Sequence, residues 1–176
     1  MDPVRIGDKL INRNKIHRQI DAILELRMQG FSQLEVAKAC AVDRALISRV
    51  ESLGEIRKGG RVALVAFPIS NKEEILQLAR QEGIEFTVVF SEKERWDFLE
   101  DKNGVELFNA VTGIIAKLRE SDVIIVAASN MRINLAEALL DKHVIGVTIG
   151  DSPIEEDKYL ETSIIKNIME KIKRVP

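Results

Sequence analysis

The chain has few of the residues that build redox and metal sites. Cys40 is its only cysteine, so no internal disulfide can form, and its two histidines, His17 and His143, are far apart in the sequence. Structural zinc sites take several Cys or His residues at short intervals, a spacing that is missing here. We therefore expect no metal and no other cofactor.

Long apolar runs are missing as well. No stretch approaches the roughly 20 apolar residues that a membrane-spanning helix needs, and the beginning of the chain lacks the apolar core of a secretory signal. Hydrophobic residues make up 45% and charged residues 31% of the composition, the balance of a globular protein with a packed core. We expect a cytoplasmic protein with no membrane partner.

The charges are unevenly distributed along the chain. Residues 1–61 hold 12 Lys and Arg against 8 Asp and Glu, whereas residues 62–176 hold 14 against 20. A basic front and an acidic remainder indicate a nucleic-acid contact confined to the N-terminal part, although an excess of this size also arises by chance.

A change in composition marks a domain boundary. The segment 54–62, GEIRKGGRV, places three glycines between a helical pattern and a β-branched run, as a linker or tight junction does. We therefore predict an N-terminal domain over residues 1–59 and a C-terminal domain over residues 60–176.

The N-terminal domain is expected to be helical. A first helix is indicated by apolar residues at helical spacing that end at Gly30, a residue type that commonly follows a helix end. These apolar residues are Ile16, Ile20, Ile23 and Leu24.

Two short helices should follow, at about 33–40 and 44–52. Ser32 with Glu35 forms a capping box before the first of them, and Asp43 supplies a cap before the second. The small Ala37 permits the two helices to cross closely. The expected inner face consists of Leu34, Val36 or Ala37, Val42, Ile47 and Val50.

The second short helix directs polar and basic residues away from that core. Its outer face consists of Arg44, Ala45, Ser48 and Arg49. A helix with a basic first turn, held at a steep angle against a partner, fits the major groove of DNA. Ordinary helix packing is the alternative, with Arg44 and Arg49 solvated or paired with Glu51 and Glu55.

The stretch 32–51, SQLEVAKACAVDRALISRVE, resembles the helix-turn-helix of the Cro and phage-repressor type, also called xenobiotic-response-element-like. Members of that family read Ser-Gln, then Val-Ala, a turn, and Ile-Ser-x-x-Glu. The resemblance implies a transcriptional regulator that binds double-stranded DNA. It also implies that Gln33 contacts phosphate and braces the recognition helix, and that the following residues face the groove: Arg44, Ala45, Ser48 and Arg49.

The chain departs from the family pattern in two places. The turn has Ala41 where the family usually has glycine, and alanine in a left-handed turn costs on the order of 1 kcal/mol. The chain also reaches Gly54 and Gly59 before the family's usual fourth and fifth helices, which often supply dimer contacts.

Further phosphate contacts are expected from Lys38 and from Arg57 or Lys58 in the junction. The N-terminal tail is interpreted either as a DNA-touching arm or as a loose terminus, and the loose terminus is preferred. Its basic residues are Arg5, Lys9, Arg13 and Lys15.

The C-terminal domain alternates apolar strands with helices. Apolar runs without polar alternation predict strands covered on both faces, at 61–67, 86–90, 122–128 and 143–149. Helical patterns cover 72–82, 105–119, 133–142 and 159–173, the last with a stripe of Leu160, Ile164, Ile168 and Ile172. This order predicts an α/β fold with right-handed βαβ units, a roughly four-stranded parallel sheet and a Rossmann-like three-layer arrangement.

A ligand in such a domain would bind at the carboxyl ends of the strands. Neither a Gly-x-Gly-x-x-Gly nor a Gly-Lys-Ser/Thr sequence is present, so dinucleotide or triphosphate binding is not expected. Ser129, Asn130 and Arg132 form the most promising loop, where they either bind a small polar or anionic effector or simply cap a helix.

Two other functions compete with a DNA-binding homodimer. A serine recombinase would need an activated serine among several arginines; Ser70 is the available nucleophile, but no arginine cluster accompanies it. A non-catalytic assembly protein would pair chains through the last helix and an apolar stripe, although covering the sheet is the preferred role of both. That stripe consists of Val105, Phe108, Val111, Ile115 and Leu118.

Overall fold

The computed structural model of the chain describes residues 3–55, 60–140 and 143–173. They form a mixed α/β protein whose main sheet has four parallel strands. The chain divides into two compact units, Met1–Glu55 and Ile56–Pro176. Within the described ranges, no helix combines the length and the apolar character that crossing a bilayer requires.

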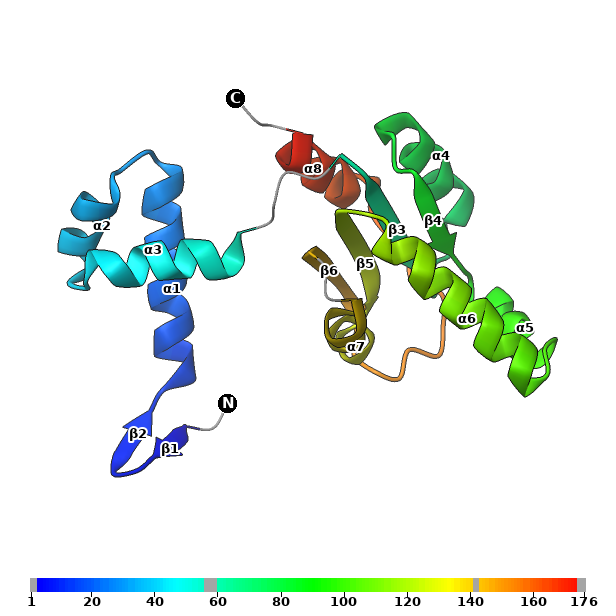
Figure 1. The fold of residues 1–176 in the computed structure, drawn as a ribbon, viewed down its shortest axis with the longest axis horizontal. Coiled ribbons are helices and arrows are strands. Elements are labelled where there is room, and N and C mark those ends of the chain that lie inside the picture. The colour runs from blue at the N-terminus through cyan, green and yellow to red at the C-terminus, as the bar shows by residue number, and fades with distance from the viewer. Residues whose placement is uncertain (1–2, 56–59, 141–142, 174–176) are drawn as a thin grey trace. The chain divides into compact units, whose positions relative to one another are not determined.

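The N-terminal unit begins with a hairpin (Figure 1). Strands β1 (Val4–Ile6) and β2 (Lys9–Ile11) pair antiparallel. Gly7 turns the chain at φ 56°, a left-handed conformation that glycine adopts without a Cβ clash. The preferred interpretation of this segment as a loose terminus is therefore wrong. Strands of three residues are too short to show alternation, and Gly7 beside Asp8 was the available turn signal.

Three helices follow the hairpin: α1 (Arg13–Met28), α2 (Gln33–Cys40) and α3 (Arg44–Gly54). The predicted bounds of α2 are confirmed, and α3 runs to residue 54 rather than 52. The Ser32 hydroxyl accepts from the Glu35 N–H at 3.3 Å, and the Glu35 carboxylate accepts from the Ser32 N–H at 2.7 Å, as a capping box requires. Asp43 stands at the start of α3 but makes no side-chain capping bond.

A small core joins these helices. Its buried residues are Ile23, Val36, Ala37 and Ile47, with Leu26, Cys40 and Val42 partly buried against them. The prediction of Leu34 as a core residue is wrong, because its side chain is 55% exposed. The buried arc of α2 is centred between Val36 and Ala37, and Leu34 lies about 110° away from it at 100° per residue. Ile16 and Leu24 of the expected α1 stripe are exposed too.

The C-terminal unit is built on a parallel sheet in the order β4-β3-β5-β6 (Figure 1). Its strands are β3 (Val62–Ala66), β4 (Phe86–Val89), β5 (Val123–Ser129) and β6 (His143–Gly150), each within one residue of its predicted bounds. β5 is buried along its whole length, as its unbroken apolar sequence predicts. From β3 the chain goes first to β4 on one side and later to β5 on the other. The carboxyl ends of β3 and β5 therefore flank a crevice.

Helices cover both faces of this sheet (Figure 1). One face is packed by α4 (Lys72–Glu82) and α8 (Thr162–Lys173), the other by α6 (Gly104–Arg119) and α7 (Asn130–Leu140). The prediction of α4 is confirmed and that of α6 is correct to one residue. In contrast, α7 begins three residues earlier than predicted and α8 three residues later.

Two predicted apolar stripes are only partly correct. On α8 the buried residues are Ile165 and Met169, whereas Ile164 is 37% exposed. On α6 the C-terminal half covers the sheet through Leu118, but Val105 and Phe108 in the N-terminal half are 71% and 67% exposed. The first turns of α6 thus contribute an apolar surface rather than core.

The sequence pattern does not predict α5 (Glu92–Glu100), which lies between β4 and α6. None of its residues is buried, so it has no apolar stripe to detect. Its available signal is the capping box of Ser91 and Glu94, in which the Ser91 hydroxyl accepts from the Glu94 N–H at 3.2 Å and the Glu94 carboxylate accepts from the Ser91 N–H at 2.9 Å.

Candidate functional site

The outer face of α3 is the first candidate site. Arg44, Ala45, Ser48 and Arg49 are all exposed, while Ile47 on the opposite side is fully buried. The spacing of these four residues places them on one side of the helix. The core beneath Ile47 therefore fixes which side chains α3 presents outward.

A chain of hydrogen bonds links the three helices at one end of this face. The Glu51 carboxylate accepts from Arg27 Nε of α1 at 2.5 Å and from Gln33 Nε2 of α2 at 2.7 Å. The Gln33 amide oxygen in turn accepts from Arg44 Nε at 3.2 Å. Gln33, the first residue of α2, thus binds Arg44, the first residue of α3.

The same hydrogen bonds show which residues pair with Glu51. Glu51 is bonded to Arg27 and Gln33 and not to Arg44 or Arg49. The Arg27 hydrogen bond, followed by that from Gln33, holds the pKa of Glu51 below its ordinary value. Among the described residues neither Arg44 nor Arg49 pairs with Glu51 or Glu55, whereas the solvated form of the ordinary-packing alternative fits the exposed Arg49.

Glu51→Gln should remove a pH-dependent part of the stability of the N-terminal unit. Because the pKa of Glu51 is lower in the folded state, its contribution is fully present above the ordinary pKa of a glutamate carboxyl. The contribution is lost as the pH falls through the lowered value. At neutral pH we expect a loss of about 1 kcal/mol, since the pair is roughly 30% exposed. Urea unfolding of both proteins from neutral to acid pH should show the difference shrinking; a constant difference would contradict the assignment.

Arg49 and Lys38 are the other described cations among the predicted DNA contacts, and the Lys38 charge acts on the Glu35 carboxylate of the same helix. Among the described residues, Arg49 and Lys38 are exposed and neither makes a hydrogen bond or ion pair. Arg57 and Lys58 lie outside the described residues. The predicted tail residue Arg5 belongs to β1 of the hairpin.

The turn between α2 and α3 is left-handed at Ala41, with φ 53° and ψ 47°. It is the position where the resembling family has glycine. The Ala41 N–H bonds back to Lys38, and the Val42 N–H bonds back to Ala37 at 3.0 Å, which closes the helix end. The turn therefore has the expected geometry without the expected residue.

Ala41→Gly should stabilise the N-terminal unit by about 0.5 to 1 kcal/mol, because relief of the left-handed alanine exceeds the added flexibility of the unfolded chain. Ala45→Gly is a matched control on right-handed helix and should destabilise by a similar amount. Urea unfolding followed by circular dichroism measures both. Destabilisation by both substitutions would show that the Ala41 methyl group has a packing role that outweighs the strain.

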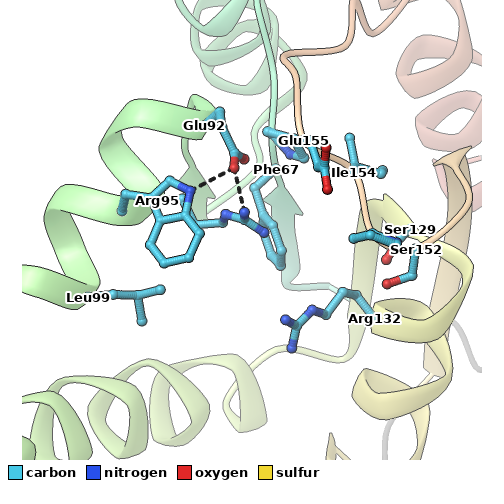
Figure 2. Close-up of a pocket in the computed structure, with 12 residues that line it drawn as sticks. Phe67, Glu92, Arg95, Leu99, Ser129, Arg132, Ser152, Ile154 and Glu155 are labelled. Atoms are coloured by element: carbon cyan, nitrogen blue, oxygen red, sulfur yellow. Dashed lines mark hydrogen bonds and ion pairs between the residues drawn. The ribbon is translucent and has the colours of Figure 1, made fainter.

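A second candidate site is a pocket of about 520 Å³ in the C-terminal unit (Figure 2). Phe67 and Pro68 after β3 form one wall, and residues 152–155 after β6 form another. Ser129 and Arg132, at the junction of β5 and α7, and side chains of α5 complete it. The pocket thus occupies the crevice between the carboxyl ends of β3 and β5, where open parallel sheets bind ligands.

Of the three predicted ligand-binding residues, two line this pocket. Ser129 is 4% exposed and Arg132 extends from the first turn of α7. Asn130 is used differently: its amide oxygen accepts from the Met131 N–H at 2.7 Å and the Ser152 N–H at 3.2 Å, and its amide nitrogen donates to Asp151 at 3.1 Å. Asn130 therefore fastens the chain after β6 to the start of α7.

The α5 wall of the pocket carries functional groups that the sequence reading missed. Arg95 donates to the Glu92 carboxylate at 2.6 Å, and Trp96 Nε1 donates to the same oxygen at 2.8 Å (Figure 2). Arg95 Nε and the other Glu92 oxygen are buried without a partner among the described residues. Buried polar groups rarely stay unpaired, so these are two polar atoms of the α5 wall that the described side chains leave unsatisfied.

Ser70, the nucleophile that a serine recombinase would need, lies apart from the arginines of the pocket. Ser70 is exposed, its hydroxyl makes no hydrogen bond there, and it does not line the pocket that holds Arg95 and Arg132. No group of three His, Cys, Asp or Glu side chains is arranged to hold a metal among those residues.

No protein-family model, curated protein or solved structure matches the chain.

Proposed function

We propose that the protein is a sequence-specific DNA-binding transcriptional regulator. Residues 1–59 form a helix-turn-helix domain in which α3 is the recognition helix. Residues 60–176 form a Rossmann-like domain that dimerises, binds an effector, or does both. The observation that carries the proposal is the outer face of α3, whose arginines are exposed above a core that orients them.

The support for this proposal is geometric and electrostatic. The helix start at Arg44 is tied to Gln33, the residue that in the resembling family contacts phosphate and braces the recognition helix. Arg49 has no intramolecular partner among the described residues and is free to bind a guanine edge with two hydrogen bonds. Lys38 is exposed on α2 as a phosphate contact.

A homodimer is part of the proposal, since one short helix reads only a few base pairs and paired half-sites one helical turn apart extend the sequence that is read. The C-terminal unit offers two surfaces for it. β6 is an edge strand of the sheet, and α7 beside it exposes Met131, Leu135 and Leu139 at helical spacing. The other surface is the exposed first half of α6.

The test is to select binding sequences from a random double-stranded library with the full-length protein and measure affinities at several salt concentrations. We expect an enriched motif with two related half-sites and an affinity that falls steeply with salt. Sedimentation gives the number of chains bound. Absence of an enriched motif together with absence of salt-dependent DNA affinity would contradict the proposal and favour an assembly protein.

A further inference from the structure

The pocket of the C-terminal unit contains an unusual helix start. α7 has 11 residues, follows β5 directly, and has no acidic side chain in its first turn. Its first N–H groups carry the positive end of the helix dipole. The β5–β6 pairing shifts register between Ala128 and Ser129, which sets the direction of the last strand residue.

Ser129 is the independent observation that points to a ligand at this helix start. The residue is only 4% exposed and lines the pocket. Among the described residues its hydroxyl has no hydrogen-bond partner, so it does not cap α7. The Asn130 amide oxygen already accepts from the Met131 N–H at 2.7 Å, and the Ser129 hydroxyl, which lines the pocket at this helix start, is a further donor available to an anion.

Two arginines add positive charge around the same space. Arg132 projects from the first turn of α7 and has no intramolecular partner among the described residues (Figure 2). Across the pocket, Arg95 is bonded to Glu92 through one nitrogen and leaves its Nε unpaired. Arginine binds carboxylate and phosphate through paired hydrogen bonds, which suits the exposed Arg132, while Arg95 adds positive charge across the pocket.

The carboxylates of the pocket set where the anion can lie. The charge of Glu92 is paired with Arg95, the same carboxylate accepts from the Trp96 indole, and Glu155 is an exposed residue of the lining. Asp151 accepts from the Asn130 amide at 3.1 Å beside the start of α7 but does not line the pocket. The end of the pocket near Ser129 and Arg132 is therefore the more favourable end for negative charge. At the opposite end Trp96 and Leu99 line the pocket and are 49% and 39% exposed. The Arg95 guanidinium lies over the Trp96 ring, 5.4 Å from its centroid, and the rest of this apolar wall can contact a flat ring.

We propose that this pocket binds a small organic anion, a phosphate or carboxylate joined to a planar apolar group. Ser129, the first turn of α7 and Arg132 bind the anion, and Trp96 with Leu99 contacts the planar group. The role of this ligand as an effector of DNA binding rests on the function proposed above. Binding itself does not depend on that function.

Trp96 makes the proposal directly measurable, because it is the only tryptophan in the chain. Inorganic phosphate and phenyl phosphate are titrated into the full-length protein without DNA, and binding is followed by tryptophan fluorescence and by calorimetry. We expect saturable binding of both, with phenyl phosphate about tenfold tighter because its ring contacts Trp96. Phenol, which lacks the charge, should bind more weakly than phenyl phosphate.

Variants separate the two ends of the pocket. Arg132→Ala should weaken both phosphates about tenfold or more, and Ser129→Ala should weaken both by a smaller factor. Trp96→Ala, followed by calorimetry, should weaken phenyl phosphate and leave inorganic phosphate unchanged. Arg80→Ala is the matched control, since Arg80 is an exposed arginine on α4 outside the pocket.

The proposal is overturned if neither phosphate binds saturably, or if Arg132→Ala weakens binding no more than Arg80→Ala does. Equal affinity for phosphate and phenyl phosphate would overturn the assignment of the planar group to Trp96. Because these titrations contain no DNA, a failure of ligand binding leaves the DNA-binding proposal standing. A failure of DNA selection equally leaves the ligand result intact.

Discussion

Arg49→Ala should lower the affinity of the protein for its selected DNA sequence by about 5- to 150-fold, because a two-pronged arginine–guanine contact contributes roughly 1 to 3 kcal/mol of discrimination. Arg49 makes no hydrogen bond or ion pair within the described part of the chain. Its removal should leave the unfolding free energy of the protein almost unchanged. The loss should therefore appear in DNA binding alone.

Arg44→Ala should have a similar effect on selectivity with an added structural part. Arg44 Nε donates to Gln33, which also donates to Glu51, so the substitution leaves the Gln33 oxygen without its partner. At this exposed position water can replace that bond, and the structural loss should be well below 1 kcal/mol. The double variant Arg44→Ala/Arg49→Ala should bind all sequences alike.

Two further variants separate base reading from charge. Arg49→Lys keeps the positive charge but loses the paired geometry, so it should retain salt-dependent affinity for random DNA and lose preference for the selected motif. Arg18→Ala removes the same charge from the exposed side of α1 and serves as the matched control. Fluorescence anisotropy with selected and random duplexes gives both affinities for each variant. Unchanged selectivity in both Arg44→Ala and Arg49→Ala would remove α3 from the role of recognition helix.

The strands and amphipathic helices of the C-terminal unit were predictable because burial determines them. β5 is covered on both faces and its sequence is apolar throughout, and α4 buries one stripe against the sheet, with Ile75, Leu78 and Ala79 inside. In both elements the apolar positions of the sequence are the positions that the structure buries. The sequence alone was therefore sufficient to place them.

The α5 wall of the pocket was not predictable in this way. α5 buries no residue, so its formation depends on the capping box at Ser91 and on contacts such as Phe98 against Phe90, whose ring centroids are 5.5 Å apart. Arg95 and Trp96 line the pocket together with residues that follow β3, β5 and β6, which are far apart in the sequence and are brought together by the strand order. That proximity is a property of strand order, which local sequence patterns do not contain.

Ile47→Ala should unfold most of the N-terminal unit while the C-terminal unit stays folded. Ile47 is fully buried in a core with only three other fully packed residues, Ile23, Val36 and Ala37, among those described. Isoleucine-to-alanine substitutions in cores lose about 2 to 5 kcal/mol. A unit of 55 residues has a stability of only about 3 to 8 kcal/mol, at 0.05 to 0.15 per residue. The substitution therefore removes most of the available stability.

Two signals distinguish the units in this experiment. Trp96 lies in the C-terminal unit, so its fluorescence should show an unchanged urea transition, whereas circular dichroism should show loss of helix at low urea. Leu46→Ala is the matched control, because the neighbouring Leu46 is 46% exposed and outside the core. DNA affinity should be lost in Ile47→Ala and kept in Leu46→Ala, while phenyl phosphate should bind both variants. If Ile47→Ala moved the fluorescence and circular dichroism transitions to lower urea by the same amount, the two units would unfold together, and the prediction of independent unfolding would be wrong.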